Sequence, residues 1–207
     1  MLIIFHYSTG RRLLMNVVET VLFEKPGKNN TDDCIAVVKS FIKERGIRPV
    51  VVASTSGDTA LAFHQALKKT GTPLVIVTHS VGFKEPNHDE FDAGIRAQLR
   101  KSKVAIHTGT ILSHSIEKSL LDGFKGIYPA YIIANTLRRF GEGTKVALEI
   151  VMEACDAGLV PEGDEVIGVG GTYQGADTVL LINSRTSKRF LEIDVLEILA
   201  RPRGRSR

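Results

Sequence analysis

The sequence predicts a single α/β domain built on a mostly parallel sheet with helices on both faces. Apolar runs rich in Val and Ile alternate with segments of helical period, and such alternation is typical of parallel strands covered on both sides. The 207 residues, 43% of them hydrophobic, suffice for one domain with a sizeable core. No low-complexity linker or internal repeat interrupts this order. We therefore expect one domain over residues 15–200, a peripheral N-terminal extension at 1–14 and a basic tail at 201–207.

The first strand is expected at residues 17–23, and a well-specified helix follows the turn after it. Thr31 is the expected N-cap of this helix, and Gly46 suits the left-handed position after its last residue. Charged residues at the two ends complement the helix dipole: Asp32 and Asp33 near the start, and Lys43 and Arg45 near the end. The sequence thus predicts a helix over about 31–45.

The remaining elements follow by the same alternation. Residues 50–53 form a continuous apolar run, which predicts a strand buried on both faces, and this strand leads directly into a loop rich in Ser, Thr and Gly. The segment 113–157 is rich in helical pattern. Further strands are expected at 74–77, 104–106, 166–169 and 179–182, and further helices at about 59–69 and 91–100.

The net charge of +4 lies at the ends of the chain and not in the domain. Six arginines lie near the two ends of the chain: Arg11, Arg12, Arg201, Arg203, Arg205 and Arg207. Without them the rest of the chain carries a formal charge of −2. A slightly acidic body is a poor electrostatic match for a nucleic acid duplex. We therefore expect no nucleic acid partner.

Two cysteines and the lack of a long apolar segment indicate a cytoplasmic protein. Cys34 and Cys155 lie in apolar, helix-like contexts without CxxC spacing, which predicts buried, reduced thiols. No apolar run reaches the roughly 18 residues that span a bilayer, and the apolar start at 1–5 lacks the features of a signal peptide. We expect a protein that is neither exported nor bound to a membrane.

The loop between the strand at 50–53 and the following helix is the strongest candidate site. Glycine allows backbone amides to converge on a ligand, hydroxyls donate further hydrogen bonds, and a helix N-terminus attracts anions. The alternative is an ordinary capped turn, because such turns use the same residue types. A Walker A loop is excluded, since the lysine after the second glycine is missing. The candidate phosphate-binding residues are Ser54, Thr55, Ser56, Gly57, Asp58 and Thr59.

Two further loops are expected at the same edge of the sheet and could enclose the rest of a ligand. The first follows the strand at 74–77 and offers Thr78, His79, Gly82 and Phe83. The second is glycine-rich, but it leads into a strand and so differs from a dinucleotide-binding fingerprint; a tight turn is the alternative. It offers Gly170, Gly171, Thr172, Gly175, Asp177 and Thr178.

Other catalytic chemistry has little support in the sequence. The histidines at 79, 88, 107 and 114 lack metal-binding spacing, so no metal site is expected. Ser54 and Ser56 lack the leading glycine of a nucleophile elbow. Glu24, Lys25 and His79 are the candidates for catalysis on a phosphorylated substrate.

Several motifs give the chain a resemblance to a known family. RPVVVASTSGDTA at 48–60, TPLVIVT at 72–78 and PEGDEVIGVGG at 161–171 resemble the C-terminal α/β domain of pyruvate kinase. Together with FEKPG at 23–27, HSVGFKEP at 79–86, IIANTL at 132–137 and GADT at 175–178, they are similar to a stand-alone, mainly archaeal family. The similarity runs from about residue 17 to residue 203.

The resemblance implies a three-layer α/β/α sandwich with a mostly parallel, five-stranded sheet whose last strand can run antiparallel. In pyruvate kinase the loop that matches 54–59 binds a phosphate of an allosteric sugar bisphosphate, while a separate barrel carries catalysis. This sequence contains no such barrel, so the resemblance does not imply kinase activity. Members of the stand-alone family are associated with flavin mononucleotide (FMN), whose phosphate would lie on the same loop.

Three functions follow as hypotheses. The first is binding of a phosphate-bearing small molecule, with FMN as the expected cofactor. The second is a sensor of a sugar phosphate without catalysis of its own, and the third is an enzyme acting on a phosphorylated substrate. Whether the protein forms a homo-oligomer is left open.

Overall fold

The computed structural model describes the backbone of residues 2–6 and 12–204 and the side chains of residues 17–204. The main sheet has seven strands in the order β3-β9-β8-β7-β4-β5-β6. Strand β8 is antiparallel to both of its neighbours, and the other pairs are parallel. The strands are β3 (Val21–Phe23), β4 (Val50–Ala53), β5 (Leu74–Thr78), β6 (Ala105–Thr108), β7 (Glu165–Gly170), β8 (Thr178–Asn183) and β9 (Asp194–Pro202). A separate antiparallel pair is formed by β1 (Leu2–His6) and β2 (Arg12–Asn16).

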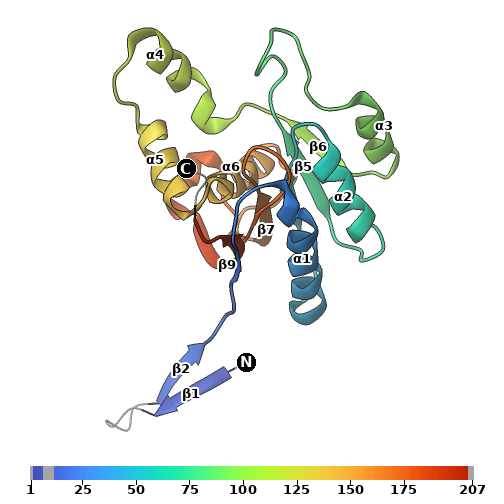
Figure 1. Cartoon of the computed structure of the whole chain (residues 1–207), viewed down its shortest axis with the longest axis vertical. Helices are drawn as coiled ribbons and strands as arrows, with labels where there is room; N and C mark the ends of the chain where they lie inside the picture. Colours follow the sequence, from blue (N-terminus) through green and yellow to red (C-terminus); the bar gives the residue numbers. More distant parts are fainter. Residues whose placement is uncertain (1, 7–11, 205–207) are drawn as a thin grey trace.

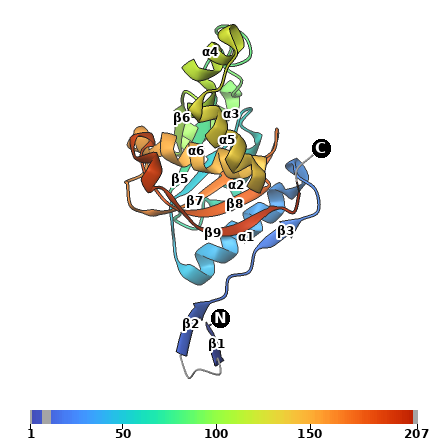
Figure 2. The same cartoon turned by 90° about the vertical axis from the view of Figure 1, so that its left-hand side faces the viewer.

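Helices cover both faces of the sheet (Figures 1 and 2). The α-helices are α1 (Thr31–Arg45), α2 (Asp58–Leu67), α3 (Ala93–Lys101), α4 (Ile116–Phe124), α5 (Pro129–Leu137) and α6 (Glu142–Asp156). Short 3-10 turns are η1 (Lys28–Asn30), η2 (Leu112–His114), η3 (Arg138–Phe140) and η4 (Ser187–Glu192). The predicted three-layer α/β/α sandwich is thus confirmed.

Alternation along each strand divides the core between the two faces. Val50 and Val52 pack with residues of α1, α2 and α3, whereas Val51 packs with residues of α6. All three valines are completely buried. Both faces of the central strands are therefore apolar, as the continuous run in the sequence predicted.

The sheet has seven strands where the resemblance implied five. Those five correspond to β6, β5, β4, β7 and β8, and β8 is the antiparallel strand that the resemblance implied. Strand β3 corresponds to the strand expected at 17–23 and pairs in parallel with β9, which was not predicted, at the edge of the sheet. Most of β9 is exposed or half-buried, so it lacks the apolar run that marks the central strands.

Two boundaries near the ends of the chain differ from the prediction. The strand expected at 17–23 is restricted to Val21–Phe23 and lies at the edge of the sheet. At the other end, Arg201 and Pro202 were assigned to the basic tail but belong to β9, where they pair with Leu22 and Phe23. The strand continues into the charged segment because strand pairing uses backbone hydrogen bonds. The carbonyl groups of arginine and proline accept such bonds like those of any other residue.

The N-cap prediction at Thr31 is wrong, because Asn30 occupies that position and Thr31 is the first helical residue. The Thr31 hydroxyl donates to the Lys28 carbonyl oxygen (2.7 Å) and accepts from the Ala176 amide (3.1 Å). This side chain therefore joins the start of α1 to the loop between β7 and β8. Gly46 has a positive φ of 91°, as expected after the last residue of α1.

Both cysteines are free and buried, as predicted. Burial is the main cause that raises the pKa of the Cys34 thiol, and the carboxylates of Asp177 and Asp33 add to it. A protonated, inaccessible thiol is unreactive, which agrees with a structural role.

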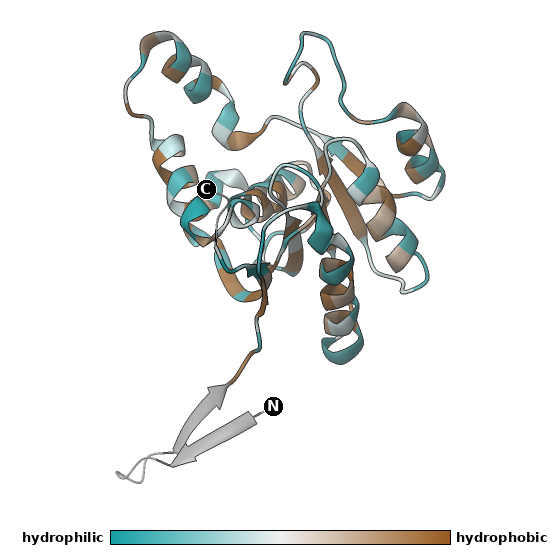
Figure 3. Cartoon of the chain, viewed as in Figure 1, coloured by the Kyte–Doolittle hydropathy of each residue, from teal (hydrophilic) through white to brown (hydrophobic). Residues whose placement is uncertain are grey.

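Helix α4 extends away from the sheet (Figure 1), and the segment of α4 and α5 carries several hydrophobic residues (Figure 3). Ile116, Phe124 and Ile127 are 76%, 80% and 84% exposed. None of the helices within the described residues combines the length and the apolar character that a membrane span requires.

Close packing between α6 and β7 yields a test of the fold. A Cβ added at Gly170 would lie 2.3 Å from the Gly143 carbonyl oxygen and 2.9 Å from the Ala147 nitrogen, whereas one at Gly123 in α4 would meet nothing within 4 Å. We expect Gly170→Ala to lower the free energy of unfolding by about 1–3 kcal/mol. The control Gly123→Ala should raise it by about 0.5–1 kcal/mol, because alanine favours helix. Urea denaturation measures both, and an unchanged Gly170→Ala protein would contradict this packing.

Candidate functional site

A cleft of about 1340 Å³ opens at the carboxyl ends of β4, β5 and β7. Its walls come from the β4–α2 loop, the long loop after β5, helices α5 and α6, and the β7–β8 loop. Ligands of open α/β sheets bind at this edge, because the strands end there and the loops diverge. The three loops chosen from the sequence thus meet around one cavity.

The β4–α2 loop combines turns held by side chains with free backbone amides. The Ser54 hydroxyl accepts from the Ala60 amide (3.2 Å), and the Ser56 hydroxyl donates to Asp58 Oδ2 (2.9 Å). Gly57 has a φ of 105°, which a glycine adopts without strain. Within the residues that the structure describes, the amides of Ser56, Gly57 and Thr59 have no acceptor. The start of α2 therefore presents unpaired donors.

Most of the predicted site residues line the cleft. These are Ser54, Thr55, Ser56, Asp58, Thr59, Thr78, His79, Phe83, Gly171, Thr172 and Gly175. Gly57 and Gly82 shape their loops without lining it. A Cβ at Gly57 would lie 3.0 Å from Ile95, on the side of α3.

Gly170, Asp177 and Thr178 were predicted site residues but lie behind the cleft wall. Gly170 packs against α6. The Asp177 carboxylate is completely buried and accepts from the amides of Gly27 (2.8 Å) and Thr172 (3.1 Å) and from the Thr178 hydroxyl (2.9 Å). These residues hold the β7–β8 loop in place, so their part in the site is structural.

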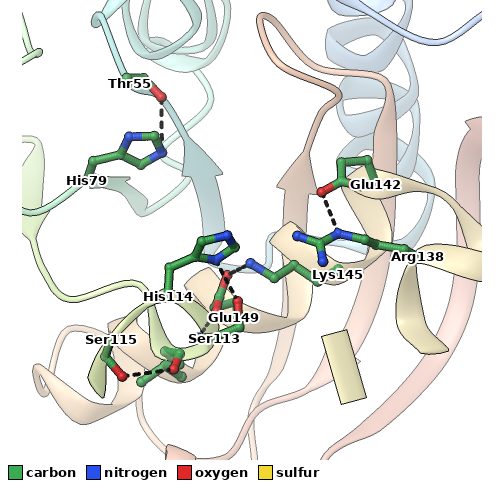
Figure 4. A network of polar contacts seen from close by, with 10 residues as sticks. Thr55, His79, Ser113, His114, Ser115, Arg138, Glu142, Lys145 and Glu149 are labelled. Atoms are coloured by element: carbon green, nitrogen blue, oxygen red, sulfur yellow. Dashed lines mark hydrogen bonds and ion pairs between the residues drawn. The ribbon is translucent and has the colours of Figure 1, made fainter. Parts of the chain in front are cut away.

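His79 is the centre of a cluster on one wall of the cleft. Its Nδ1 lies 3.0 Å from Glu90 Oε2. Its Nε2 lies 3.4 Å from the Thr55 hydroxyl oxygen, a contact drawn in Figure 4. Lys84 Nζ contacts the other Glu90 oxygen at 2.6 Å, and the Phe83 ring lies 4.4 Å from the His79 ring. Burial alone would raise the pKa of Glu90, but the contacts with Lys84 and His79 outweigh it and lower that pKa. Glu90 is thus a carboxylate that orients His79.

Charged residues of α6 form the opposite wall, and the sequence analysis did not select them. Lys145 and Glu149 form a buried ion pair, with side chains only 5% and 8% exposed. Glu149 also accepts from the Ser113 amide at 2.7 Å. Burial, with Glu149 nearby, raises the pKa of Glu153 to about 8. The four-residue spacing of Lys145, Glu149 and Glu153 could have indicated that they share one helix face. A charged stripe beside an apolar face is usually exposed to solvent, however, so the spacing alone does not indicate a site.

His114 connects the two walls of the cleft (Figure 4). Its ring lies 6.1 Å from that of Phe83 and 6.0 Å from that of Tyr131. Burial is the main cause that lowers the pKa of His114, and Lys145 adds to this effect. A neutral imidazole therefore lines the cleft at neutral pH.

The charges around the cleft nearly cancel. Five Lys and Arg side chains and six Asp and Glu side chains line it, and the raised pKa of Glu153 removes one negative charge at pH 7. Arg138 is paired with Glu142 at 2.7 Å. An anion would therefore be held mainly by local donors and not by a general positive field. Over the described part of the chain, no group of three or more His, Cys, Asp or Glu residues is arranged to hold a metal ion.

Comparison with protein families identifies the domain. The family described as pyruvate kinase, alpha/beta domain, matches residues 32–182. The chain belongs to this family. The match extends from α1 to β8 and includes the five strands that the resemblance implied, whereas β3 and β9 lie outside it. The three loops that border the cleft fall within the matched segment of this alpha/beta domain.

The buried carboxyl group of Glu153 predicts a pH dependence of stability. Because the folded state raises its pKa from 4.5 to about 8, the folded protein binds this proton more tightly than the unfolded chain. The stabilisation is complete below about pH 4.5 and is lost as the pH rises towards 8. At pH 8.5 the free energy of unfolding of Glu153→Gln should therefore exceed that of wild type by roughly 2–4 kcal/mol. Urea denaturation measures this difference.

At pH 5 the difference between Glu153→Gln and wild type should be much smaller. Glu44→Gln, an exposed change on α1, is the matched control and should differ little from wild type at either pH. A Glu153→Gln protein that is destabilised equally at both values would show that the acid is not buried as described.

Proposed function

We propose that this alpha/beta domain binds FMN, with the phosphate on the β4–α2 loop and the ribityl chain and ring enclosed by the loops at 78–83 and 170–178. The observation that carries the proposal is the set of free amides of Ser56, Gly57 and Thr59, which stand at the start of α2 beside the Thr55 and Ser56 hydroxyls. A phosphate group needs this combination of donors and helix dipole. The cleft of about 1340 Å³ has room for the whole nucleotide.

Tyr173 supports the position of the ring system. It lies in the glycine-rich loop at the cleft edge, and its side chain is 92% exposed. Its φ is 62°, a left-handed conformation that costs a non-glycine residue roughly 1–2 kcal/mol, and a hydrogen bond from the Gln174 amide to the Thr172 carbonyl (2.8 Å) closes the turn around it. An aromatic side chain kept in an unfavourable turn and exposed to water fits a role in stacking on a ligand.

A sugar phosphate is the second candidate ligand. The observation in its favour is the polar α6 wall, where Lys145, Glu149 and Glu153 offer donors and acceptors that suit hydroxyl groups. Calorimetry against phosphorylated sugars and FMN distinguishes the two ligands. The same proposal assigns the protein to a reducing cytoplasm, which the two buried free thiols support.

The phosphate is expected to be required for flavin binding. The fluorescence of FMN should be quenched as the protein is added, and this quenching measures the affinity. Riboflavin, which has no phosphate, should bind at least about tenfold more weakly than FMN. Equal affinities would show that the loop does not bind the phosphate. No change in flavin fluorescence or absorbance on titration would contradict the proposal as a whole.

Two charge changes in the loop should act in opposite directions. Ser56→Asp adds a negative charge next to the proposed phosphate and should weaken FMN binding by roughly tenfold or more, whereas Asp58→Asn removes one and should strengthen it about threefold. Ser102→Asp, at the far end of α3, is the control for added charge. Thermal melts establish that each variant folds. An unchanged affinity of both loop variants would count against this phosphate site.

Replacement of Tyr173 separates stability from binding. Tyr173→Gly removes the ring and allows the positive φ, so the free energy of unfolding should stay unchanged or rise by up to about 1 kcal/mol. FMN affinity should nevertheless fall about 3- to 10-fold, because the stacking contact is lost. Urea denaturation and flavin titration measure the two effects. An unchanged affinity would place the flavin ring elsewhere.

A further inference from the structure

Thr55, His79 and Glu90 are arranged in a line of three groups that the sequence does not place together. The Thr55 hydroxyl oxygen lies 3.4 Å from His79 Nε2, and His79 Nδ1 lies 3.0 Å from Glu90 Oε2. The Glu90 side chain is 8% exposed, and the Thr78 hydroxyl donates to the Thr55 carbonyl oxygen at 3.3 Å. A hydroxyl, an imidazole and a carboxylate in this order form the arrangement that activates a nucleophile.

The surroundings of Thr55 supply the other parts that acyl transfer needs. Thr55 lies in the turn between strand β4 and helix α2, with its side chain on the cleft. The amide of the next residue, Ser56, and that of Gly57 have no acceptor in the described part of the chain. Free amides directly after a nucleophile in a strand–turn–helix segment are positioned to bind an oxyanion.

Glu90 and the Phe83 ring determine the orientation of the imidazole. When His79 donates its Nδ1 proton to Glu90, Nε2 is left as a proton acceptor facing Thr55. The Lys84 contact and the lowered pKa of Glu90 keep the carboxylate charged at neutral pH. Phe83 covers one side of the His79 ring at 4.4 Å. The imidazole is thus held in the tautomer that a general base requires.

We propose that Thr55, His79 and Glu90 form a catalytic relay that hydrolyses small carboxylic esters in the cleft. Thr55 Oγ attacks the carbonyl carbon while its proton moves to His79 Nε2, and the carbonyl oxygen becomes an oxyanion bound by the amides of Ser56 and Gly57. Collapse of this intermediate breaks the ester bond, and the departing alcohol takes the proton from His79. The acyl group is left on Thr55.

Water completes the reaction without any further reactant. A water molecule attacks the acyl carbon and gives a proton to His79, and collapse then releases the carboxylic acid and returns that proton to Thr55 Oγ. The net change is ester and water to acid and alcohol. This activity goes beyond the proposed FMN binding, although both use the amides at the start of α2.

The test uses the flavin-free full chain and p-nitrophenyl acetate. Thr55→Val keeps the shape of the side chain without its hydroxyl, and His79→Gln removes the base; each should lower the hydrolysis rate about 100-fold or more. Glu90→Gln should lower it about tenfold or more. Thr55→Ser keeps a hydroxyl and should restore most of the activity that Thr55→Val loses. His88→Gln, a change of an exposed histidine on the same rim, should leave the rate unchanged.

A fluorophosphonate probe reports the nucleophile directly. Mass spectrometry should find the adduct on Thr55 in wild type and no adduct at this residue in His79→Gln, which a merely structural role of His79 would not produce. Failure of wild type to exceed buffer hydrolysis, or an adduct on another residue, would overturn the relay. Hydrolysis without FMN binding would overturn only the proposed function, and FMN binding without hydrolysis only the relay.

Discussion

Burial of the central strands on both faces is the constraint on which the rest of the structure depends. Val50, Val51 and Val52 are fully enclosed between the α1–α3 layer and α6, and a buried strand of this kind cannot carry exposed polar groups. Polar chemistry is consequently restricted to the ends of the strands. The cleft lies at the carboxyl ends, where the loops after β4, β5 and β7 come together.

The shape of that cleft depends on groups that no ligand would touch. Asp177 gathers the amides of Gly27 and Thr172 and the Thr178 hydroxyl around one buried carboxylate, which connects the turn before α1 with the β7–β8 loop. Thr31 adds a second link through its contacts with Lys28 and Ala176. These links cross large distances in the chain, so the glycine-rich loop is held against the first helix as part of the fold.

The two walls of the cleft differ in their chemistry. Near the start of α2, free amides and the His79–Glu90 pair offer donors and an oriented base. On α6, the pairing of Lys145 with Glu149 and the raised pKa of Glu153 keep buried charge to a minimum. A nearly neutral cavity with strong local donors is suited to recognise a particular group on a ligand, and a broad positive surface would instead attract any anion.

The sequence alone determined the α/β class, the central strands, the helices around them and the position of the Ser54–Thr59 loop, because apolar periodicity and turn residues act over short stretches of chain. It did not show β9 at the edge, since that strand is only partly buried, nor the role of Asp177. The meeting of Thr55 with His79, 24 residues away, and of His79 with Glu90, 11 residues further on, was decided by the tertiary structure. The same is true of Glu153, whose pKa is raised mainly because the folded chain buries its carboxyl group, with Glu149 of the same helix adding to the effect. Strand order and packing set these contacts, and neither is a property of a local segment.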